Sequence, residues 1–497
     1  MYRYEAFLCC LVATFMVQHT TEAALPSLYI VIRSQPNSYH EMKSSVLLRD
    51  IEQQADEINA DVSIVELHRE WPDDYDKAWA ILPIMPELVN SEAMKKDWVM
   101  FLEDSTVINI EKVLKVLSRF DYKKDLFLGR GLYDTDMVII HHFSSRKAQG
   151  GGRFLFPDFD VGWVLSSILV RKVGDDWLKS PPGKDFLIDL KHEIAVHLSD
   201  KHNVELTNVE EFCGSGEETP NCATNVLKDI PICDDKITLD DILVSVKTTL
   251  MFHKDRVKVV MDTWGPKVKN IVFYSNYTDP SIPTIDCGVP NTIRGHCGKS
   301  DAILKDFLKR AEVNDYKWLV VADDDTIMSV ARLVQFLNCY DHEEATFLGE
   351  KYGYGLNIKN GYAYITGGGG MVFSKPAVEV WVKECKCPSL DTPDDMYLGQ
   401  CLFRKGVIST HSTLFHQARP PAYAKGFLAN QTPISFHKHW MIDPIKVYSD
   451  WFKKADAGLP TYNHAVAHST VSTTPQPIVA PTPLPPTPLE NPLKDEL

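Results

Sequence analysis

Two stretches of this sequence match each other at a constant separation of 220 residues. Residues 98–117 read WVMFLEDSTVINIEKVLKVL and residues 318–337 read WLVVADDDTIMSVARLVQFL, with the tryptophan, the second acidic residue and the threonine in register. The same separation relates the Phe-Leu-Gly sequences at 127–129 and 347–349. A period of this length is far longer than that of a solenoid repeat. The sequence therefore predicts that a whole domain is duplicated.

Each copy is predicted to be an α/β domain with a mostly parallel sheet. In the first copy, strand-like runs at 28–33 and 62–67 flank an amphipathic helical pattern at 39–58. In the second copy, a strand-like run at 242–246 is followed by a helical pattern at 252–263. Strands that alternate with helices are typical of parallel sheets, and ligands of such sheets bind beyond the carboxyl ends of the strands.

Three adjacent carboxylates, Asp323, Asp324 and Asp325, directly follow the apolar strand-like run of the second copy. Neighbouring carboxylates repel one another, so a strand end that presents three of them requires a cation. A hard divalent ion that takes oxygen ligands beside a diphosphate fits this requirement. The alternative is a helix N-terminus, where an Asp caps the first turn. A cap accounts for one carboxylate but not for three.

The two copies differ where chemistry is expected. The first has Glu-Asp-Ser at 103–105 in place of the three aspartates, and Asp-Val-Gly at 160–162 in place of part of the glycine run 367–370. Glycine has no side chain, so the backbone of Gly368 and Gly369 can approach a ligand closely. These differences indicate that only the second copy is a working one.

The chain divides into four predicted regions. Residues 1–23 carry a basic residue, an apolar run and a small-residue cleavage site, which indicate a signal peptide. The degenerate copy, with a Cys-rich connector at its end, spans 24–235, and the working copy spans 236–455. Residues 456–497 are rich in Pro and Thr and end in Lys-Asp-Glu-Leu. This ending is a retrieval signal read by the KDEL receptor, so we expect residence in the lumen of the endoplasmic reticulum.

Composition agrees with a lumenal protein. Beyond the signal peptide no stretch approaches the roughly 20 apolar residues that span a bilayer, so we expect no membrane insertion after cleavage. Nine of the 11 cysteines lie beyond residue 23, which allows four disulfides and leaves one free thiol. Asn276 and Asn430 begin glycosylation sequons. The net charge of −15 argues against nucleic acid as a partner.

A second acidic pair, Asp394 and Asp395, opens a predicted helix at 396–404. One carboxylate of such a pair, with a pKa raised by its neighbour, is suited to take a proton from a hydroxyl group. The residues by themselves leave open which of the two is the base. Further along the chain, His437 and His439 stand in an apolar, aromatic setting. Either histidine can add a nitrogen ligand to a metal at the acidic site.

These motifs resemble those of the Fringe-related inverting β-1,3-glycosyltransferases. The resemblance rests on WLVVADDDT at 318–326, Ile-Thr with four glycines at 365–370, Pro-Asp-Asp at 393–395 and Ser-Phe-His-Lys at 435–438. It covers residues 236–455 strongly. It implies two tandem GT-A-like domains, the fold of nucleotide-diphospho-sugar transferases, with the first domain degenerate.

The resemblance also implies roles for the acidic residues. Asp325, Asp323 and His437 would ligate a Mn²⁺ cofactor. Asp323 and Asp324, with the two central glycines of the run, would hold the nucleotide-sugar donor. The catalytic base falls within the pair Asp394-Asp395, and Asp395 is preferred by analogy with relatives in which the second acid does this work.

The resemblance implies UDP-glucose as donor and O-linked fucose on thrombospondin type 1 repeats as acceptor, with transfer to the fucose 3-hydroxyl in a β-1,3 linkage. Fringe proper has a membrane anchor and no retrieval signal, which favours the glucose-transferring member of the family. Two alternatives stay open. Close relatives share the acidic motif while using another UDP-sugar, and both copies could instead form a lumenal pseudoenzyme that binds glycans or proteins.

Overall fold

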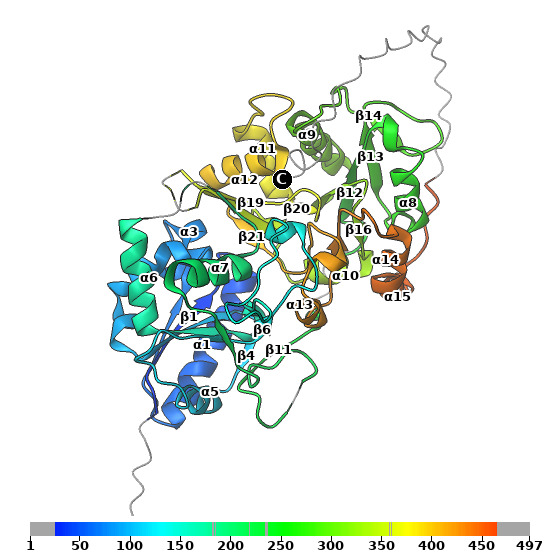
Figure 1. Cartoon of the computed structure of the whole chain (residues 1–497). Coiled ribbons are helices and arrows are strands. Elements are labelled where there is room, and N and C mark those ends of the chain that lie inside the picture. Colours follow the sequence, from blue (N-terminus) through cyan, green and yellow to red (C-terminus); the bar gives the residue numbers. More distant parts are fainter. Residues whose placement is uncertain are drawn as a thin grey trace, which may run out of the picture.

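The computed structural model describes residues 25–464, apart from residues 181, 182, 184, 218, 234–236, 357 and 359. The predicted signal peptide and retrieval signal lie outside this part of the chain. Within it, no helix combines the length and the apolar character needed to cross a bilayer. The described chain forms two α/β halves, coloured blue through cyan to green and green to orange in Figure 1.

The first half contains a six-stranded sheet in the order β2-β1-β3-β8-β5-β10. The strand β8 runs antiparallel to its neighbours β3 and β5, and the other pairs are parallel. The strands are β1 (Leu28–Arg33), β2 (Val62–Glu66), β3 (Trp98–Glu103), β5 (Phe127–Gly129), β8 (Trp163–Ser166) and β10 (Leu206–Asn208).

The second half contains a seven-stranded sheet in the order β14-β13-β12-β15-β20-β17-β21. Here β20 is antiparallel to β15 and β17, and the remaining pairs are parallel. The strands are β12 (Ile242–Lys247), β13 (Ile271–Ser275), β14 (Thr284–Asp286), β15 (Trp318–Asp323), β17 (Phe347–Gly349), β20 (Met371–Ser374) and β21 (Ser409–His411).

The two sheets agree in strand order and register over six strands. In each, the strand that carries the repeated tryptophan lies between a parallel and an antiparallel neighbour. Trp98 lies opposite Ser166 and Trp318 lies opposite Ser374. Residues separated by 220 in the sequence therefore occupy equivalent places in the two sheets.

The predicted helices form with small differences at their ends. The pattern at 39–58 becomes α1 (Ser38–Glu57), and the helix expected at 396–404 begins two residues earlier as α12 (Asp394–Arg404). The pattern at 252–263 splits into a short turn and α8 (Arg256–Asp262), because the Asp255 carboxylate accepts from the Arg256 amide and starts the helix there. The other long helices are α5 (Ile110–Leu117), α6 (Ser167–Lys179), α7 (Leu190–His202), α9 (Cys297–Asn314), α10 (Val330–Leu337), α11 (Lys375–Glu384) and α14 (Pro444–Trp451).

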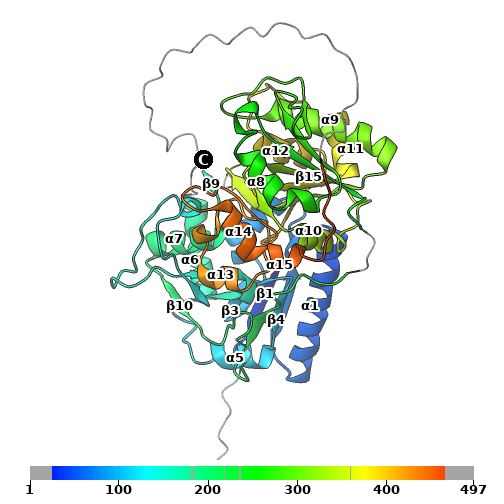
Figure 2. The same cartoon turned by 90° about the vertical axis from the view of Figure 1, so that its right-hand side faces the viewer.

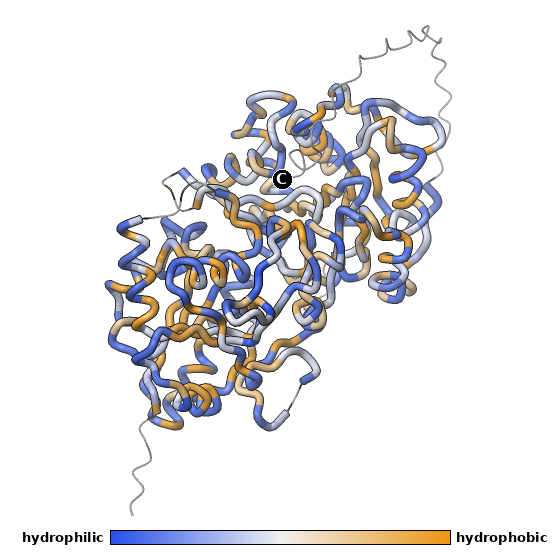
Figure 3. Tube along the Cα trace, in the orientation of Figure 1, coloured by the Kyte–Doolittle hydropathy of each residue, from blue (hydrophilic) through white to orange (hydrophobic). Residues whose placement is uncertain are grey.

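The strand β15 is buried on both faces, which explains its continuous apolar sequence. Leu319 and Val321 pack in one cluster with side chains from α9, α11 and α12. Val320 and Ala322 pack in another cluster with side chains from α8 and α10. Figure 3 shows the resulting apolar segments running through the centre of each half.

Covalent, backbone and ionic contacts join the two halves, which lie against each other in Figures 1 and 2. The strand β9 (Phe186–Leu187) of the first half pairs antiparallel with β18 (Lys351–Tyr354) of the second. A disulfide links Cys233 to Cys339. The Lys351 Nζ atom lies 2.8 Å from Oδ1 of Asp76, with no exposure of the lysine side chain.

The cysteines form four disulfides and leave Cys287 free among the described residues, which agrees with the predicted maximum. The bonded pairs are Cys213–Cys222, Cys233–Cys339, Cys297–Cys387 and Cys385–Cys401. The two predicted glycosylation sequons differ in access. Asn276 is exposed, whereas Asn430 is buried and its side-chain nitrogen donates to Asp158 at 2.7 Å. Asn430 is therefore inaccessible for glycosylation in the folded chain.

Asp76→Ala is expected to lower the free energy of unfolding by about 3–5 kcal/mol, because the Lys351 ammonium is then buried without a counter-charge. Denaturant unfolding of the full chain followed by circular dichroism measures this. Asp76→Ala/Lys351→Met should recover much of the loss. Asp74→Ala, which breaks an exposed pair with Lys77, should cost under about 1 kcal/mol. Equal losses in the single and double variants would show that the ion pair is not the cause.

Candidate active site

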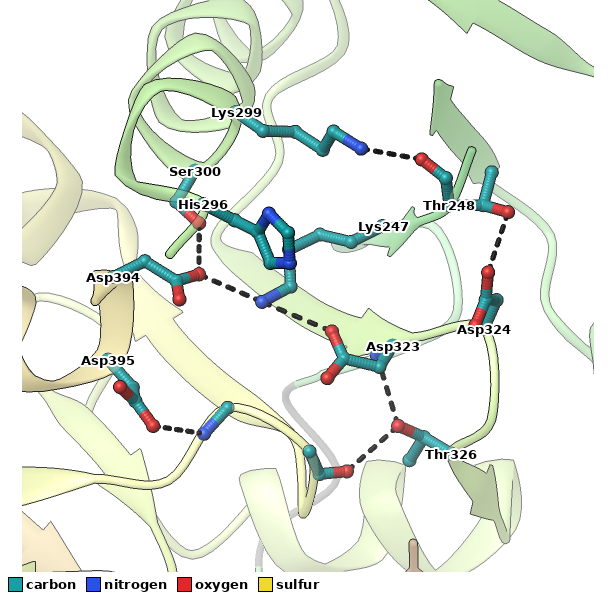
Figure 4. A network of polar contacts seen from close by, with 12 residues as sticks. Lys247, Thr248, His296, Lys299, Ser300, Asp323, Asp324, Thr326, Asp394 and Asp395 are labelled. Atoms are coloured by element: carbon teal, nitrogen blue, oxygen red, sulfur yellow. Dashed lines mark hydrogen bonds and ion pairs between the residues drawn. The ribbon is translucent and has the colours of Figure 1, made fainter. Parts of the chain in front are cut away.

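The acidic residues lie at the carboxyl ends of two neighbouring strands. Asp323 ends β15 and Lys247 ends β12, and the parallel register sets these two residues side by side. The turn after β15 is held by Thr326, whose hydroxyl accepts from the Asp323 amide at 3.0 Å and donates to the Gly368 carbonyl at 2.8 Å. The turn thereby binds the glycine run to the acidic strand (Figure 4).

Asp323, Asp325 and His437 form a cluster whose ligand atoms all lie within 4.8 Å of one another. The His437 Nε2 atom is 2.9 Å from Oδ1 of Asp325 and 3.8 Å from Oδ2 of Asp323. The opposite ring nitrogen, Nδ1, lies 3.0 Å from the Gln417 carbonyl, to which it donates. This bond leaves the Nε2 lone pair facing the carboxylates, which is the tautomer a metal requires. The two oxygens and one nitrogen fit a divalent cation such as Mn²⁺.

Two residues that the sequence motifs do not single out hold this cluster in place. The Gln417 side chain accepts from the Gly369 amide at 2.9 Å, while its carbonyl orients His437. The Gln417 backbone N–H in turn donates to the Glu350 carboxylate, which also accepts from the Tyr423 hydroxyl. Burial raises the pKa of Glu350 to about 8. An acidic residue directly after the Phe-Leu-Gly strand was the only sequence signal for Glu350.

The glycine run allows the close approach that the cluster needs. A Cβ atom on Gly368 would lie 2.2 Å from the His437 ring, which is a severe overlap. Gly369 uses its carbonyl to accept from the Ser435 hydroxyl. Gly370 has φ of +103°, a conformation that other residues rarely adopt. The glycines predicted to lie beside a ligand thus also give His437 its place.

Asp324 points away from the metal cluster. Its carboxylate accepts from the Thr248 hydroxyl at 2.7 Å and from Arg256 at 3.2 Å, and the side chain is buried. Burial and the neighbouring Asp325 charge raise the pKa of Asp324 to about 7. Burial also opposes ionisation of Asp325, but His437 and Arg256 hold its pKa below the usual value. Arg256, which the motifs did not indicate, thus contacts both Asp324 and Asp325.

The second acidic pair divides into one carboxylate paired with a lysine and one held by the backbone amides of Gly367 and Met396. Asp394 accepts from Lys247 at 2.9 Å and from Ser300 at 2.6 Å, so that despite burial its pKa is lowered to about 2. Burial and the Asp394 charge raise the pKa of Asp395 to about 6. Asp395 lies at the start of α12, with one oxygen 3.3 Å from the Gly367 amide, and is only partly buried (Figure 4). The arrangement favours Asp395 as the proton acceptor.

Of the two candidate histidines, the structure brings only His437 to the carboxylates. The His439 Nε2 atom lies 3.2 Å from the Phe436 carbonyl, and His439 is outside the ligand cluster. Burial and the neighbouring His437 lower the pKa of His439 to about 4.

The first half keeps the frame of this site but lacks two of its three potential metal ligands. Thr106 donates to the Asp160 carbonyl at 2.9 Å, as Thr326 does to Gly368. The antiparallel pair of β4 (Thr106–Ile108) and β11 (Thr224–Val226) repeats the pair of β16 (Ile327–Met328) and β22 (Ser435–Phe436). In this frame Ser105 stands where the second half has Asp325, and Val226 where it has His437. Both side chains are poor metal ligands.

Comparison with known proteins also divides the chain into two segments, one in each half. A family model described as Fringe-like matches residues 80–197 and 237–458. The chain belongs to this Fringe-like family. It is 44% identical over 443 residues to the human protein named beta-1,3-glucosyltransferase, and the aligned residues make up 88% of each chain. It is likewise 44% identical over 434 residues to the mouse protein of that name, covering 87% of this chain and 88% of the mouse one.

More distant relatives match a smaller part. The Xenopus laevis beta-1,3-N-acetylglucosaminyltransferase lunatic fringe is 29% identical over 130 residues, which is 25% of this chain and 34% of that one.

Gly368→Ala is expected to abolish tight binding of Mn²⁺, because the new methyl group would displace the His437 ring. Titration with Mn²⁺ followed by electron paramagnetic resonance measures the free ion. Gly367→Ala is the matched control, since its Cβ would lie 3.6 Å from the nearest atom, Nζ of Lys247. Unchanged Mn²⁺ affinity in Gly368→Ala would remove His437 from the ligand set.

Proposed function

We propose that this protein transfers glucose from UDP-glucose to the 3-hydroxyl of O-linked fucose on thrombospondin type 1 repeats, forming a β-1,3 linkage. The proposal is carried by the cluster of Asp323, Asp325 and His437 in a chain that is 44% identical to relatives named beta-1,3-glucosyltransferase. The clustered ligands support an enzyme over a binding protein, because a pseudoenzyme has no need of them.

The donor site is proposed to lie between the acidic turn and the glycine run. Asp323, Asp325 and His437 would hold Mn²⁺, which when bound supplies positive charge against the negative charge that grows on the departing diphosphate. Asp324, with its oxygens directed by Thr248, would bind the donor together with the backbone of Gly368 and Gly369.

Asp395 is proposed as the catalytic base. Its carboxylate takes the proton of the acceptor hydroxyl while that oxygen attacks the anomeric carbon of the donor, and a single displacement inverts the configuration there. Asp394 is a positioning residue: Lys247 and Ser300 occupy its oxygens, and its charge helps to raise the pKa of Asp395. Fixing both sugars in line accounts for much of the remaining acceleration.

The domain plan and compartment belong to the same proposal. We infer that residues 24–235 and 236–455 are tandem GT-A-like domains, the first degenerate, supported by the two matched segments and by the shared strand order. The signal-like start and the Lys-Asp-Glu-Leu ending support residence in the endoplasmic reticulum lumen.

Removing residues 494–497 should cause secretion from cultured cells, as detected by immunoblot of the medium. Unchanged retention would contradict the retrieval role.

The function is tested by offering UDP-glucose, UDP-galactose or UDP-N-acetylglucosamine, with Mn²⁺, to an O-fucosylated thrombospondin repeat. Mass spectrometry should show transfer of glucose only. In Asp395→Asn the rate should fall about 10²–10⁴-fold, because the amide cannot accept the proton, while repeat and donor still bind. Binding of the repeat without transfer from any donor would favour the pseudoenzyme, and transfer of another sugar would change the donor.

The rate of transfer should depend on pH through Asp395. This residue works as a base only when ionised, so kcat/KM should fall as the pH drops through about 6, the raised pKa of its carboxyl group. Asp394→Asn removes a nearby negative charge and should move this acid limb to lower pH. Initial rates across a pH series measure the acid limb in the unaltered chain and in Asp394→Asn. An acid limb that stays in place in Asp394→Asn would assign it to another group.

A further inference from the structure

Aromatic side chains from both halves form a row on one face of the small sheet β19-β18-β9: Phe186, Tyr354, Tyr362 and Tyr364. The strand β19 (Tyr362–Ile365) pairs antiparallel with β18, which pairs in turn with β9 of the first half. Tyr354 lies opposite Phe186 on one side and opposite Tyr362 on the other, so the three side chains leave the sheet on the same face. The ring of Tyr354 is centred 4.8 Å from that of Phe186 and 5.9 Å from that of Tyr362. All three residues are partly exposed.

The aromatic row ends beside Asp395, because β19 packs on α12 (Figure 1). Asp395 and Gly399 are four residues apart on this helix and therefore lie on the same face of it. A Cβ atom on Gly399 would lie 2.5 Å from the Cβ atom of Tyr364, so strand and helix touch one turn away from Asp395. Three residues after Tyr364, the Gly367 amide donates to the Asp395 carboxylate at 3.3 Å. These two contacts place Tyr364 near the proposed base.

Tyr364 continues the row, since it lies two residues from Tyr362 on the same face of β19. It is only 5% exposed. Within the part of the chain that the structure describes, the hydroxyls of Tyr362 and Tyr364 make no hydrogen bond, and neither oxygen is enclosed. Largely buried tyrosine hydroxyls usually have a partner. Burial and the Asp395 charge raise the pKa of Tyr364, which keeps its hydroxyl protonated. Two polar groups beside the base are therefore open to a ligand.

We propose that the acceptor binds along this aromatic row, an inference that rests on the proposed transfer to a sugar carried by a protein. Ligand sites commonly combine aromatic walls with a few placed polar groups. The four side chains of the row are uncharged, which suits a neutral sugar better than the diphosphate of the donor. Tyr362 and Tyr364 would hydrogen-bond hydroxyl groups of the acceptor sugar, with one sugar hydroxyl facing Asp395. Phe186 and Tyr354, farther along the row, would pack on apolar side chains of the attached protein.

The proposal gives the first half a part in the reaction. Phe186 belongs to β9, which lies between α6 and α7 of the first half. The Asp185 carbonyl accepts from the Gly355 amide at 2.9 Å and so fixes β9 against β18. A chain without the first half would keep the proposed donor site but lose one end of the acceptor site.

Tyr364→Phe removes one hydroxyl and keeps the ring. In the full chain it should raise the KM for the O-fucosylated repeat about 3–10-fold, the effect of one lost hydrogen bond. The dissociation constant of UDP-glucose with Mn²⁺, measured by calorimetry, should stay unchanged. Tyr316→Phe is the matched control, because Tyr316 precedes β15 at the end opposite to Asp323 and packs against Phe307. It should leave both constants unchanged.

Phe186→Ala tests the contribution of the first half. It should raise the same KM at least about fivefold, as truncation of an aromatic contact does, without a change in UDP-glucose binding. Phe120→Ala, at a partly exposed phenylalanine after α5 of the first half, is the control and should have no effect.

The inference is overturned if either Tyr364→Phe or Phe186→Ala keeps the KM of the unaltered chain, or if UDP-glucose binding weakens in either variant. A lack of transfer to the repeat by the unaltered chain would overturn the proposed function itself, and this inference with it.

Discussion

A buried ammonium group holds the second half together at the carboxyl ends of its central strands. Lys247 lies between Asp323 at 3.1 Å and Asp394 at 2.9 Å, and so joins the end of β15 to the start of α12. Without this lysine, two carboxylates would face each other in a poorly solvated space, at a cost of several kcal/mol. Lys247 also keeps Asp394 ionised, and the charge of Asp394, together with burial, raises the pKa of Asp395.

The first half shows how much of this arrangement belongs to the fold itself. Arg33 ends its first strand and pairs with Glu103, in the register of Lys247 and Asp323. Threonine-to-carbonyl bonds and an added antiparallel strand pair recur in both halves. Backbone geometry needs only these contacts, whereas metal ligation needs particular side chains. The frame can therefore persist where ligands are absent, which is why fold and function are argued separately.

Much of the fold could be predicted from local pattern. Continuous apolar runs gave the central strands, since strands buried on both faces tolerate few polar residues. Helix ends were less predictable. The helix α8 begins at Arg256 rather than at residue 252, because the Asp255 side chain accepts a hydrogen bond from the Arg256 amide. The acidic turn, the glycine run and His437 were predicted together, and the structure brings them within reach of one another. The supporting roles of Gln417 and Glu350 were missed.

The sequence by itself determined that a domain is repeated and that the second copy concentrates acidic and glycine residues at a strand end. Apart from the family resemblance, which favoured His437 and Asp395, the residues could not choose between His437 and His439 or give separate roles to Asp394 and Asp395. Those choices depend on which partner reaches each atom: the Gln417 carbonyl for one histidine, and Lys247 for one carboxylate. Such contacts join segments far apart in the chain, so only the tertiary structure shows them.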